Sequence, residues 1–369
     1  MMAAVGLIRF LDRYLGGLIC IILSFFVSKP KDISRKRILL IQFWGIGETI
    51  LTLPTIKELR KKHKDAEIDV LTTKRVDEVF FNNKNISNIR LVDLNPISIK
   101  LFILANFRKY DLVIDMEEYL NISAIIGFLV GKERVGYGHG LRSKLYTKKV
   151  DYNDQQHVSQ TYMDLLKPLG IKIKVGELER LVYLPEDREN LESMLKRKGV
   201  SGKFIVFSPG VAESSRFRMW PEERWAELLK QVISKYKINV IFVGNLEAKI
   251  LIQSIMGKSG NPKNAFNFAG GTSLTGLFAL MEKAELVVSI DSGPMHIAAA
   301  QNAKTIGLFG PNTPVRFAPF SKKSVSIYKP VAKPIINVHK GEVPSHSDID
   351  FMSSIQVKDV MEAVDRLMK

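Results

Sequence analysis

The sequence predicts an α/β protein made of two Rossmann-like halves, each with a parallel sheet covered by helices on both faces. Short apolar, β-branched runs alternate along the chain with longer segments of helical periodicity, which is the pattern of parallel strands joined by helices. The 369 residues are too many for one ordinary core and fit two domains of about 150 residues each. A hydrophobic content of 46% with 25% charged residues is typical of a globular protein.

The first half carries four predicted strands. A glycine-containing turn at 43–48 follows the first of them, and a helix with a basic last turn follows at 49–63. The strands alternate with helices, so we expect one doubly wound domain over residues 34–175. The predicted strands span residues 37–42, 67–72, 89–93 and 111–115.

The second half repeats this pattern, and we expect a second Rossmann-like domain over residues 176–369. Its predicted strands span residues 203–208, 239–243, 286–290 and 304–309, and its predicted helices 221–236, 274–283 and 358–368. Two such halves facing a cleft would bind ligands at the carboxyl ends of the strands, where both sets of loops meet.

The segment 287–300 predicts a phosphate-binding corner. Its sequence, VVSIDSGPMHIAAA, ends a buried strand at Asp291 and begins a helix after Ser292-Gly293. Such a turn points free backbone N–H groups and the positive end of the helix dipole at one spot. The hydroxyl of Ser292 and the imidazole of His296 can add donors there. The alternative is an ordinary capped helix with a histidine nearby.

The net charge and the few histidine and cysteine residues limit which partners, metal sites and disulfides we expect. A net charge of +16 predicts an anionic partner, which could be a membrane surface, a nucleic acid or a phosphorylated substrate. Zinc-finger, RNP-like and basic-zipper patterns are absent, so we expect no nucleic-acid partner. The six histidines show no ligand spacing, and we expect no metal site. The single cysteine, Cys20, excludes an intramolecular disulfide framework.

Residues 1–33 predict a membrane-associated segment with a basic linker. Residues 14–28 carry no charge, but they are fewer than the roughly 18 that a spanning helix needs. Asp12 and Arg13 share one helical face, opposite an apolar face, and five Lys and Arg residues follow between 29 and 37. We therefore expect an interfacial or re-entrant anchor that precedes the catalytic domains. A cleaved signal peptide is one alternative, but no A-x-A-like cleavage site follows the apolar residues. A buried core helix is the other alternative.

Four separated segments, in order, resemble glycosyltransferase family 9, the group of the lipopolysaccharide heptosyltransferases. The resemblance covers almost everything from residue 37 to residue 369. The segments are RILLIQFWGIGETILTLPTIKELRKKHKDAEIDVLT, FSPGVAESSRFRMWPEERWAELL, GGTSLTGLFALMEKAELVVSIDSGPMHIAAAQNAKTIGLFGPNTPVRFAP and FMSSIQVKDVMEAV. The resemblance implies the two-domain GT-B fold. It also implies sugar transfer from a nucleotide-sugar donor, without a metal, to a lipid-linked or lipopolysaccharide acceptor.

The function expected from this resemblance is that of a membrane-associated, inverting glycosyltransferase at the cytoplasmic face of the inner membrane, peripheral or monotopic. The transferred sugar would be a heptose or a hexose, with ADP-heptose as a candidate donor and no cofactor. The basic surface fits an anionic membrane and a cell-envelope glycolipid acceptor.

The resemblance places the donor site in the second half. A departing nucleoside diphosphate needs positive charge or hydrogen-bond donors. Arg218 matches the family's basic residue before Trp220-Pro221, and Arg216 is the other arginine of the same loop. The full expected donor set is Ser214, Arg218, Glu247 for the ribose, Thr272 for the nucleobase, Asp291, Ser292, Gly293 and His296.

The resemblance places the catalytic base in the first half. An acceptor hydroxyl must lose a proton, and Glu48 stands where the family usually has aspartate in a Gly-Asp pair. Gly45 and Gly47 let the backbone of this acceptor-side loop approach a substrate closely. The alternative role of Glu48 is an acidic residue that complements a helix dipole. If Glu48 is not the base, Asp115 and Glu117 at a strand end are the next candidates.

Two other functional classes remain open. A nicotinamide-dependent oxidoreductase needs a third glycine, but Ile50 stands at that position of the 45–50 turn; Asp69 has about the right spacing for the acidic partner. A catalytically silent protein that binds envelope glycans would keep the fold and lose the base, and the departure at Glu48 is the feature that supports it.

Overall fold

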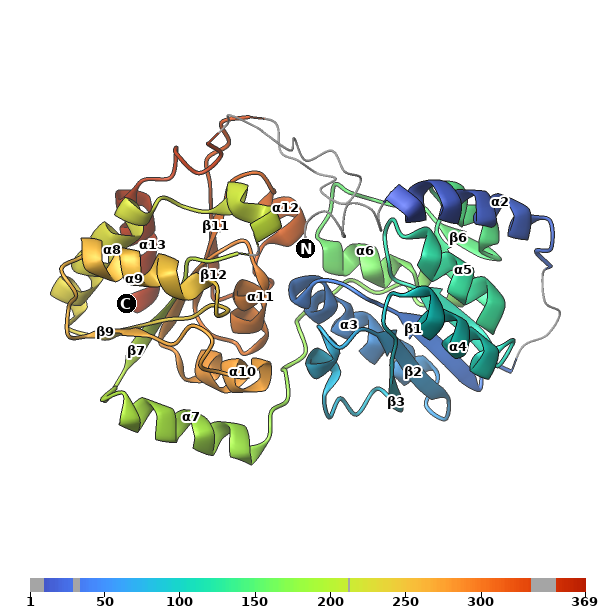
Figure 1. Ribbon diagram of the computed structural model, residues 1–369, viewed down its shortest axis with the longest axis horizontal. Helices are drawn as coiled ribbons and strands as arrows, with labels where there is room; N and C mark the ends of the chain where they lie inside the picture. The colour runs from blue at the N-terminus through green and yellow to red at the C-terminus, as the bar shows by residue number, and fades with distance from the viewer. Residues whose placement is uncertain (1–9, 29–33, 212, 333–349) are drawn as a thin grey trace. The chain divides into compact units, whose positions relative to one another are not determined.

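The computed structural model describes residues 10–28, 34–211, 213–332 and 350–369. The chain divides into two compact units, Met1–Gly176 and Glu177–Lys369. In the described residues of each unit, six strands pair in parallel in one sheet (Figure 1). This confirms the predicted α/β class with two parallel sheets.

Unit 1 contains a doubly wound sheet whose strand order is β3-β2-β1-β4-β5-β6. The central strands β1 and β4 are almost wholly buried, which explains their continuous apolar sequences. The strands are β1 (Arg37–Ile41), β2 (Glu67–Thr72), β3 (Asn88–Leu91), β4 (Tyr110–Asp115), β5 (Gly131–Tyr137) and β6 (Lys148–Val150).

The helices of unit 1 cover both faces of this sheet. Helices α3 (Ile46–Lys62) and α6 (Val158–Asp164) pack together on one face, and α4 (Pro96–Asn106) and α5 (Asn121–Val130) pack together on the other (Figure 1). Right-handed crossovers require this division, because the chain runs from β1 towards one edge and from β3 back towards the other.

The N-terminal residues 10–28 pack against unit 1. They form a π-helical turn, η1 (Asp12–Gly16), and a helix, α2 (Gly17–Ser24). The carboxylate of Asp12 accepts hydrogen bonds from the backbone N–H groups at the start of α5, at 3.0 and 2.8 Å. Cys20 is fully buried against α5. This part of the expected membrane segment is therefore continuous with the core of the first unit; residues 1–9 and 29–33 lie outside the described residues.

Among residues 10–28, 34–211, 213–332 and 350–369, no helix is both long and apolar enough to cross a bilayer.

Unit 2 contains the sheet β12-β11-β10-β7-β8-β9. Its strands are β7 (Phe204–Ser208), β8 (Asn239–Phe242), β9 (Ala265–Asn267), β10 (Leu286–Ile290), β11 (Thr305–Phe309) and β12 (Ser324–Tyr328). Its helices are α7 (Pro185–Arg197), α8 (Glu222–Tyr236), α9 (Ala248–Lys258), α10 (Leu274–Lys283), α11 (Gly293–Ala300), α12 (Pro314–Phe317) and α13 (Val357–Met368).

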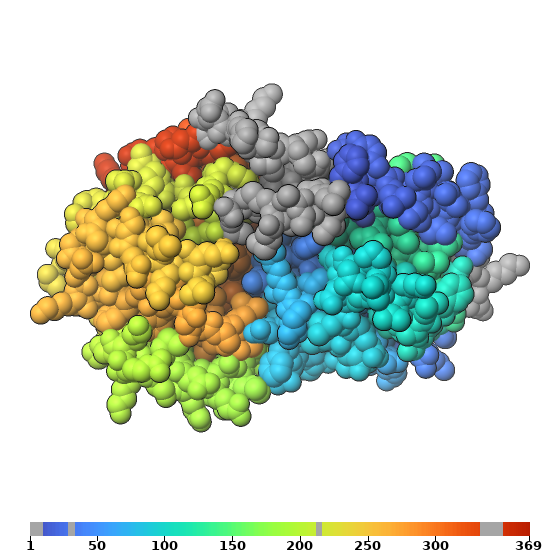
Figure 2. All heavy atoms as spheres, in the orientation of Figure 1, coloured from blue at the N-terminus to red at the C-terminus, as the bar shows by residue number. Residues whose placement is uncertain are grey.

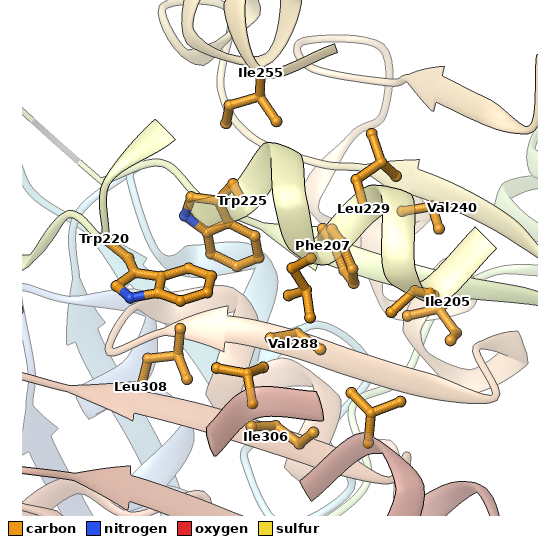
Figure 3. Packing of buried hydrophobic residues seen from close by; sticks show 14 of the residues in the cluster. Ile205, Phe207, Trp220, Trp225, Leu229, Val240, Ile255, Val288, Ile306 and Leu308 are labelled. Carbon is orange, nitrogen blue, oxygen red and sulfur yellow. The ribbon is translucent and has the colours of Figure 1, made fainter. Parts of the chain in front are cut away.

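Two tryptophans anchor the core of unit 2 (Figure 3). Trp220 and Trp225 are buried and meet edge to face, with their ring centroids 5.2 Å apart. The indole N–H of Trp220 donates to the carbonyl of Ile355 at 2.9 Å, which ties the loop after β7 to the segment before α13. Because Arg218 lies two residues before Trp220, this core contact fixes the stretch of chain that carries it.

Candidate functional site

The turn from β10 to α11 leaves the first turn of the helix without a side-chain cap. Ser292 occupies the N-cap position in an extended conformation, with φ −159° and ψ 170°, but its side chain makes no capping hydrogen bond. Its hydroxyl instead donates to the carbonyl of Ile290 at 3.1 Å and contacts the hydroxyl of Ser289 at 3.2 Å. Pro294 has no N–H, and the N–H of Met295 donates to the carbonyl of Ser292 at 3.1 Å. The backbone donors left for an anion at this helix N-terminus are therefore those of Ser292 and Gly293.

The carboxylate of Asp291 contacts the side chains of Asn312 and Arg218 beside this turn. Its buried carboxylate accepts a hydrogen bond from Asn312 Nδ2 at 2.5 Å and lies 3.5 Å from a guanidinium nitrogen of Arg218. The same arginine nitrogen donates to the Asp291 carbonyl at 3.4 Å. Burial raises the pKa of Asp291, while Arg218 and Asn312 act in the opposite direction. Asp291 is thereby engaged in positioning Arg218.

The guanidinium of Arg218 retains unused hydrogen-bonding capacity. Its Nε is buried and has no hydrogen-bond partner among the described residues, although the side chain is about one-fifth exposed. An unsatisfied buried donor is costly unless a ligand or solvent accepts from it. Of the two candidate arginines of this loop, the structure brings Arg218 to Asp291, whereas Arg216 is exposed. Ser214 lies on the same 3₁₀ turn, η5 (Glu213–Arg218).

The remaining predicted donor residues lie along the same edge of the sheet. His296 is buried on the first turns of α11, and Thr272 is half-buried just before α10. Glu247 is exposed at the start of α9 and accepts a hydrogen bond from Asn245 at 3.1 Å. A backbone hydrogen bond of 2.9 Å from Gly270 to Gly244 joins the loops that carry Thr272 and Glu247. All of them follow the carboxyl ends of strands, where open α/β sheets bind ligands.

In unit 1, Glu48 lies in the first turn of α3 and depends on Gly45. Gly45 is the N-cap residue, with φ 74° and ψ 111°, a conformation that side-chain-bearing residues rarely adopt. A Cβ atom at Gly45 would also overlap the carboxylate of Glu48. Gly47 is buried within the helix. The glycine at 45 therefore allows both the turn and the observed position of the half-buried Glu48 side chain.

The two other acidic candidates of unit 1 have structural partners. Asp115 is buried and forms an ion pair with Arg142 at 2.6 Å, and Tyr146 donates to it at 2.7 Å. Glu117 accepts a hydrogen bond from the backbone N–H of Phe43 at 2.5 Å. Burial raises the pKa of Glu117 to about 8, against the opposing effect of its backbone hydrogen bonds. The carboxylates of Asp115 and Glu117 are buried and fix the loops that follow the strands. The carboxylate of Glu48 is more exposed than either.

The structure adds groups that sequence reasoning missed. Tyr119, His139 and Tyr152 follow the carboxyl ends of β4, β5 and β6, and their rings form a half-exposed cluster with centroids 4.9 to 5.9 Å apart. Tyr152 also donates to Glu118 at 2.6 Å. In unit 2 the missed residue is Asn312, in the loop after β11. Because these residues come from separate loops, only their place after predicted strands could have signalled them.

Asp69 has a structural role that does not fit a dinucleotide site. It lies in the middle of β2 and accepts hydrogen bonds from Asn88 at 2.7 Å, Arg90 at 2.9 Å and Tyr110 at 2.9 Å. A ribose-binding carboxylate belongs at the end of the second strand and must be accessible. Asp69 is buried, which argues against the oxidoreductase alternative. Within the described part of the chain, no group of three or more His, Cys, Asp or Glu side chains is arranged to hold a metal ion.

Comparison with known proteins assigns the family. The model of glycosyltransferase family 9 (heptosyltransferase) matches residues 105–343, which is more than half of the chain. The chain belongs to glycosyltransferase family 9. The resemblance found in the sequence motifs is thus confirmed, and the protein is a glycosyltransferase.

This family 9 enzyme is similar over most of its length to several known proteins. It is 22% identical to lipopolysaccharide heptosyltransferase 3 from Escherichia coli, over 87% of this chain and 96% of the relative. A family 9 glycosyltransferase from Veillonella parvula shares its fold with a TM-score of 0.77 at 21% identity, covering 92% of this chain and 99% of the other. The ADP-heptose lipopolysaccharide heptosyltransferase II of Escherichia coli also shares this fold, with a TM-score of 0.73 at 19% identity, over 90% of this chain and 98% of the other.

Proposed function

We propose that this enzyme transfers a heptose from ADP-heptose to the lipopolysaccharide core or to another cell-envelope glycolipid, with inversion and without a metal ion. Two of the compared proteins are named for lipopolysaccharide, and one is also named for ADP-heptose. The observation that carries the proposal is the uncapped N-terminus of α11 beside Arg218, whose buried Nε has no partner among the described residues. A nucleoside diphosphate is the anion that these donors suit.

The donor diphosphate binds at the turn from Asp291 to His296. As the glycosidic bond to the diphosphate breaks, negative charge develops on the leaving oxygens. The backbone N–H groups of Ser292 and Gly293 at the start of α11 and the guanidinium of Arg218 stabilise that charge. Asp291 and Asn312 keep Arg218 in place, and these fixed donors supply the positive charge that a metal ion would otherwise provide. Glu247 holds the ribose and Thr272 lines the nucleobase pocket.

The acceptor hydroxyl loses its proton to Glu48. A single displacement at the anomeric carbon inverts its configuration, and it needs one base on the acceptor side. Gly45 leaves space for the acceptor beside the carboxylate, whereas Gly47 is buried within α3. The ring cluster of Tyr119, His139 and Tyr152 offers apolar faces and polar edges, which suit the rings and hydroxyls of an acceptor sugar.

The enzyme works at the cytoplasmic face of the inner membrane as a peripheral or monotopic protein. The apolar N-terminal segment and the net charge of +16 support attachment to an anionic membrane surface. The lipid part of the acceptor would remain in the bilayer during transfer.

Calorimetry and a transfer assay test this function. The full-length protein should bind ADP-heptose more tightly than UDP- or GDP-sugars, and a chelator should leave both binding and transfer unchanged. NMR of the product should give the anomeric configuration opposite to that of the donor. Gly293→Val blocks the close approach of an anion to the backbone and should abolish nucleotide binding in a folded protein. Unchanged affinity of that variant would refute the diphosphate placement, and donor binding without any transfer would favour a silent glycan-binding protein.

A further inference from the structure

Helix α4 is apolar on both of its faces. Ile99, Phe102 and Ile103 pack against the core of unit 1. On the opposite side, Ile97, Leu101 and Leu104 are 73%, 62% and 66% exposed. Their spacing places them on one face of the helix, one turn apart. A helix that is hydrophobic all round normally lies in a core or in a lipid environment, so the outer face of α4 lacks the environment that its sequence suits.

The N-terminal segment has an outer face of the same kind. Leu11, Leu15, Leu18 and Ile22 recur at helical spacing and are 47%, 55%, 53% and 51% exposed. The inner side of the segment carries Gly16, Asp12 and Cys20 and is used for packing. Docking on unit 1 therefore leaves an apolar stripe exposed, and Phe10, Tyr14, Phe25 and Phe26 extend it.

Helix α5 joins these two segments into one layer. It contacts α4 along one side and both η1 and α2 along the other. Because of these neighbours its own apolar side chains, such as Ile125 and Phe128, are 6% and 4% exposed. Figure 1 shows the three helices in sequence on one face of the sheet, and Figure 2 shows the α2 and α4 segments on the face that it presents. The two outer faces thus belong to the same side of unit 1.

The exposed charges on and beside these helices are mainly basic, although Asp93 just before α4 is an exposed acidic residue. Arg13 on η1, Lys100 on α4, Lys109 after α4 and Lys144 on the neighbouring turn η3 (Leu141–Leu145) are exposed. The stretch 96–109 contains no acidic residue, and the one in 10–28, Asp12, points inward to cap α5. Apolar side chains flanked by Lys and Arg suit the boundary between acyl chains and anionic headgroups. Exposed apolar side chains that gather on one side of a folded unit often mark a site of interaction with a membrane or a protein.

We propose that α4 and the η1–α2 segment together form one membrane-docking surface, which inserts shallowly into an anionic lipid bilayer. This inference rests on the proposed function, of which membrane attachment is a part. It adds to the N-terminal segment a second attachment element, α4, which belongs to unit 1 and lies far from the N-terminus in sequence. Unit 1 then rests on the bilayer with the α4–α5–α2 layer facing the lipid. The occupant is a lipid surface, because the patch joins two apolar helical faces to the exposed basic residues Arg13, Lys100, Lys109 and Lys144.

Vesicle flotation tests the role of α4. Full-length protein is mixed with vesicles of phosphatidylcholine alone or with phosphatidylglycerol, without donor or acceptor. The double variant Leu101→Glu/Leu104→Glu should lose at least about tenfold in partition to anionic vesicles while keeping nucleotide binding and its helical circular dichroism. Ile250→Glu is the matched control, because Ile250 is 77% exposed on α9 of unit 2; it should partition like the wild type. Lys100→Gln/Lys109→Gln should weaken binding to the anionic vesicles more than to the neutral ones.

Three results would overturn the inference. In the first, the α4 double variant partitions to vesicles like the wild type. In the second, Ile250→Glu loses as much vesicle binding as the α4 double variant. Alternatively, sedimentation could show that the α4 variant breaks a dimer without changing vesicle binding, which would make this face a contact between two copies. Because the assay contains no sugar nucleotide, a failure of the transferase proposal leaves its outcome unaffected.

Discussion

Glu117 accepts a hydrogen bond from the backbone N–H of Phe43 at 2.5 Å, and this bond links β4 to the loop that carries Gly45 and Glu48. Arg142 donates to the carbonyl of Glu117 at 2.5 Å, so the same residue is held on its other side. The loop between β1 and α3 is thus held by a buried carboxyl group in the loop that follows the neighbouring strand β4.

Glu117 should make the stability of the protein depend on pH. Burial raises its pKa from 4.5 to about 8, so the folded state holds a proton that the unfolded state releases between these values. The free energy of unfolding should therefore fall as pH rises from 5 to 8, by up to about 1.4 kcal/mol per pH unit for this proton. Glu117→Gln cannot ionise and should flatten that part of the profile, as measured by urea unfolding at several pH values. An unchanged slope in the variant would show that another group titrates in this window.

Glu48 should be the base, and Gly45 should position it. Glu48→Gln keeps the shape of the side chain and removes its basicity, so kcat should fall by about 100-fold or more while donor affinity stays unchanged. Gly45→Ala forces the carboxylate away and strains a backbone with φ 74°, and it should also lower kcat. Glu58→Gln, near the far end of α3, is the control and should leave kcat unchanged. If Glu48→Gln retains full turnover, a different group accepts the proton.

Arg218 should contribute to donor affinity through its charge. Arg218→Met removes the guanidinium that lies 3.5 Å from Asp291 and should weaken ADP binding by about 10- to 100-fold, the loss expected for a charge-assisted hydrogen bond. Arg216→Met removes the same charge from an exposed position in the same loop and should change affinity little. Asn312→Leu releases Asp291 and should weaken binding by a smaller factor. Calorimetry with ADP distinguishes the three variants, and equal losses for both arginines would indicate only a general charge effect.

The apolar pattern predicted eight of the twelve strands in the described residues and missed β5, β6, β9 and β12. Strands such as β1, β4 and β10 are wholly or mostly apolar and are identified by that alone. In contrast, β5 contains three consecutive charged residues, Lys132, Glu133 and Arg134. Glu133 forms ion pairs with Arg35 and Lys148, and the buried Arg134 donates a hydrogen bond to the carbonyl of Leu145. Such partners come from other segments, so local sequence cannot reveal them.

The same limit applies to the candidate site. The turn from Asp291 to His296 is recognisable because its strand, cap and helix are contiguous in sequence. Asn312 and the ring cluster around His139 come from separate loops that only the fold brings together. Asp12 shows a related ambiguity: helical periodicity places it on a polar face, but it does not say whether that face meets water or the uncapped end of another helix.

Asp12 should control the docking of the N-terminal segment, and Cys20 reports on it. Its carboxylate accepts hydrogen bonds from the N–H groups of Asn121 and Ile122, and Asp12→Ala should lose about 1 to 2 kcal/mol of this capping energy. The Cys20 thiol is fully buried, and burial raises its pKa to about 12, so its alkylation in the native protein should be slow. Undocking exposes the thiol, and Asp12→Ala should therefore accelerate alkylation by about 5- to 30-fold. Arg13→Gln, on the exposed side of the same turn, should leave the rate unchanged. A wild-type rate equal to that of the urea-unfolded chain would mean that the segment is undocked in solution.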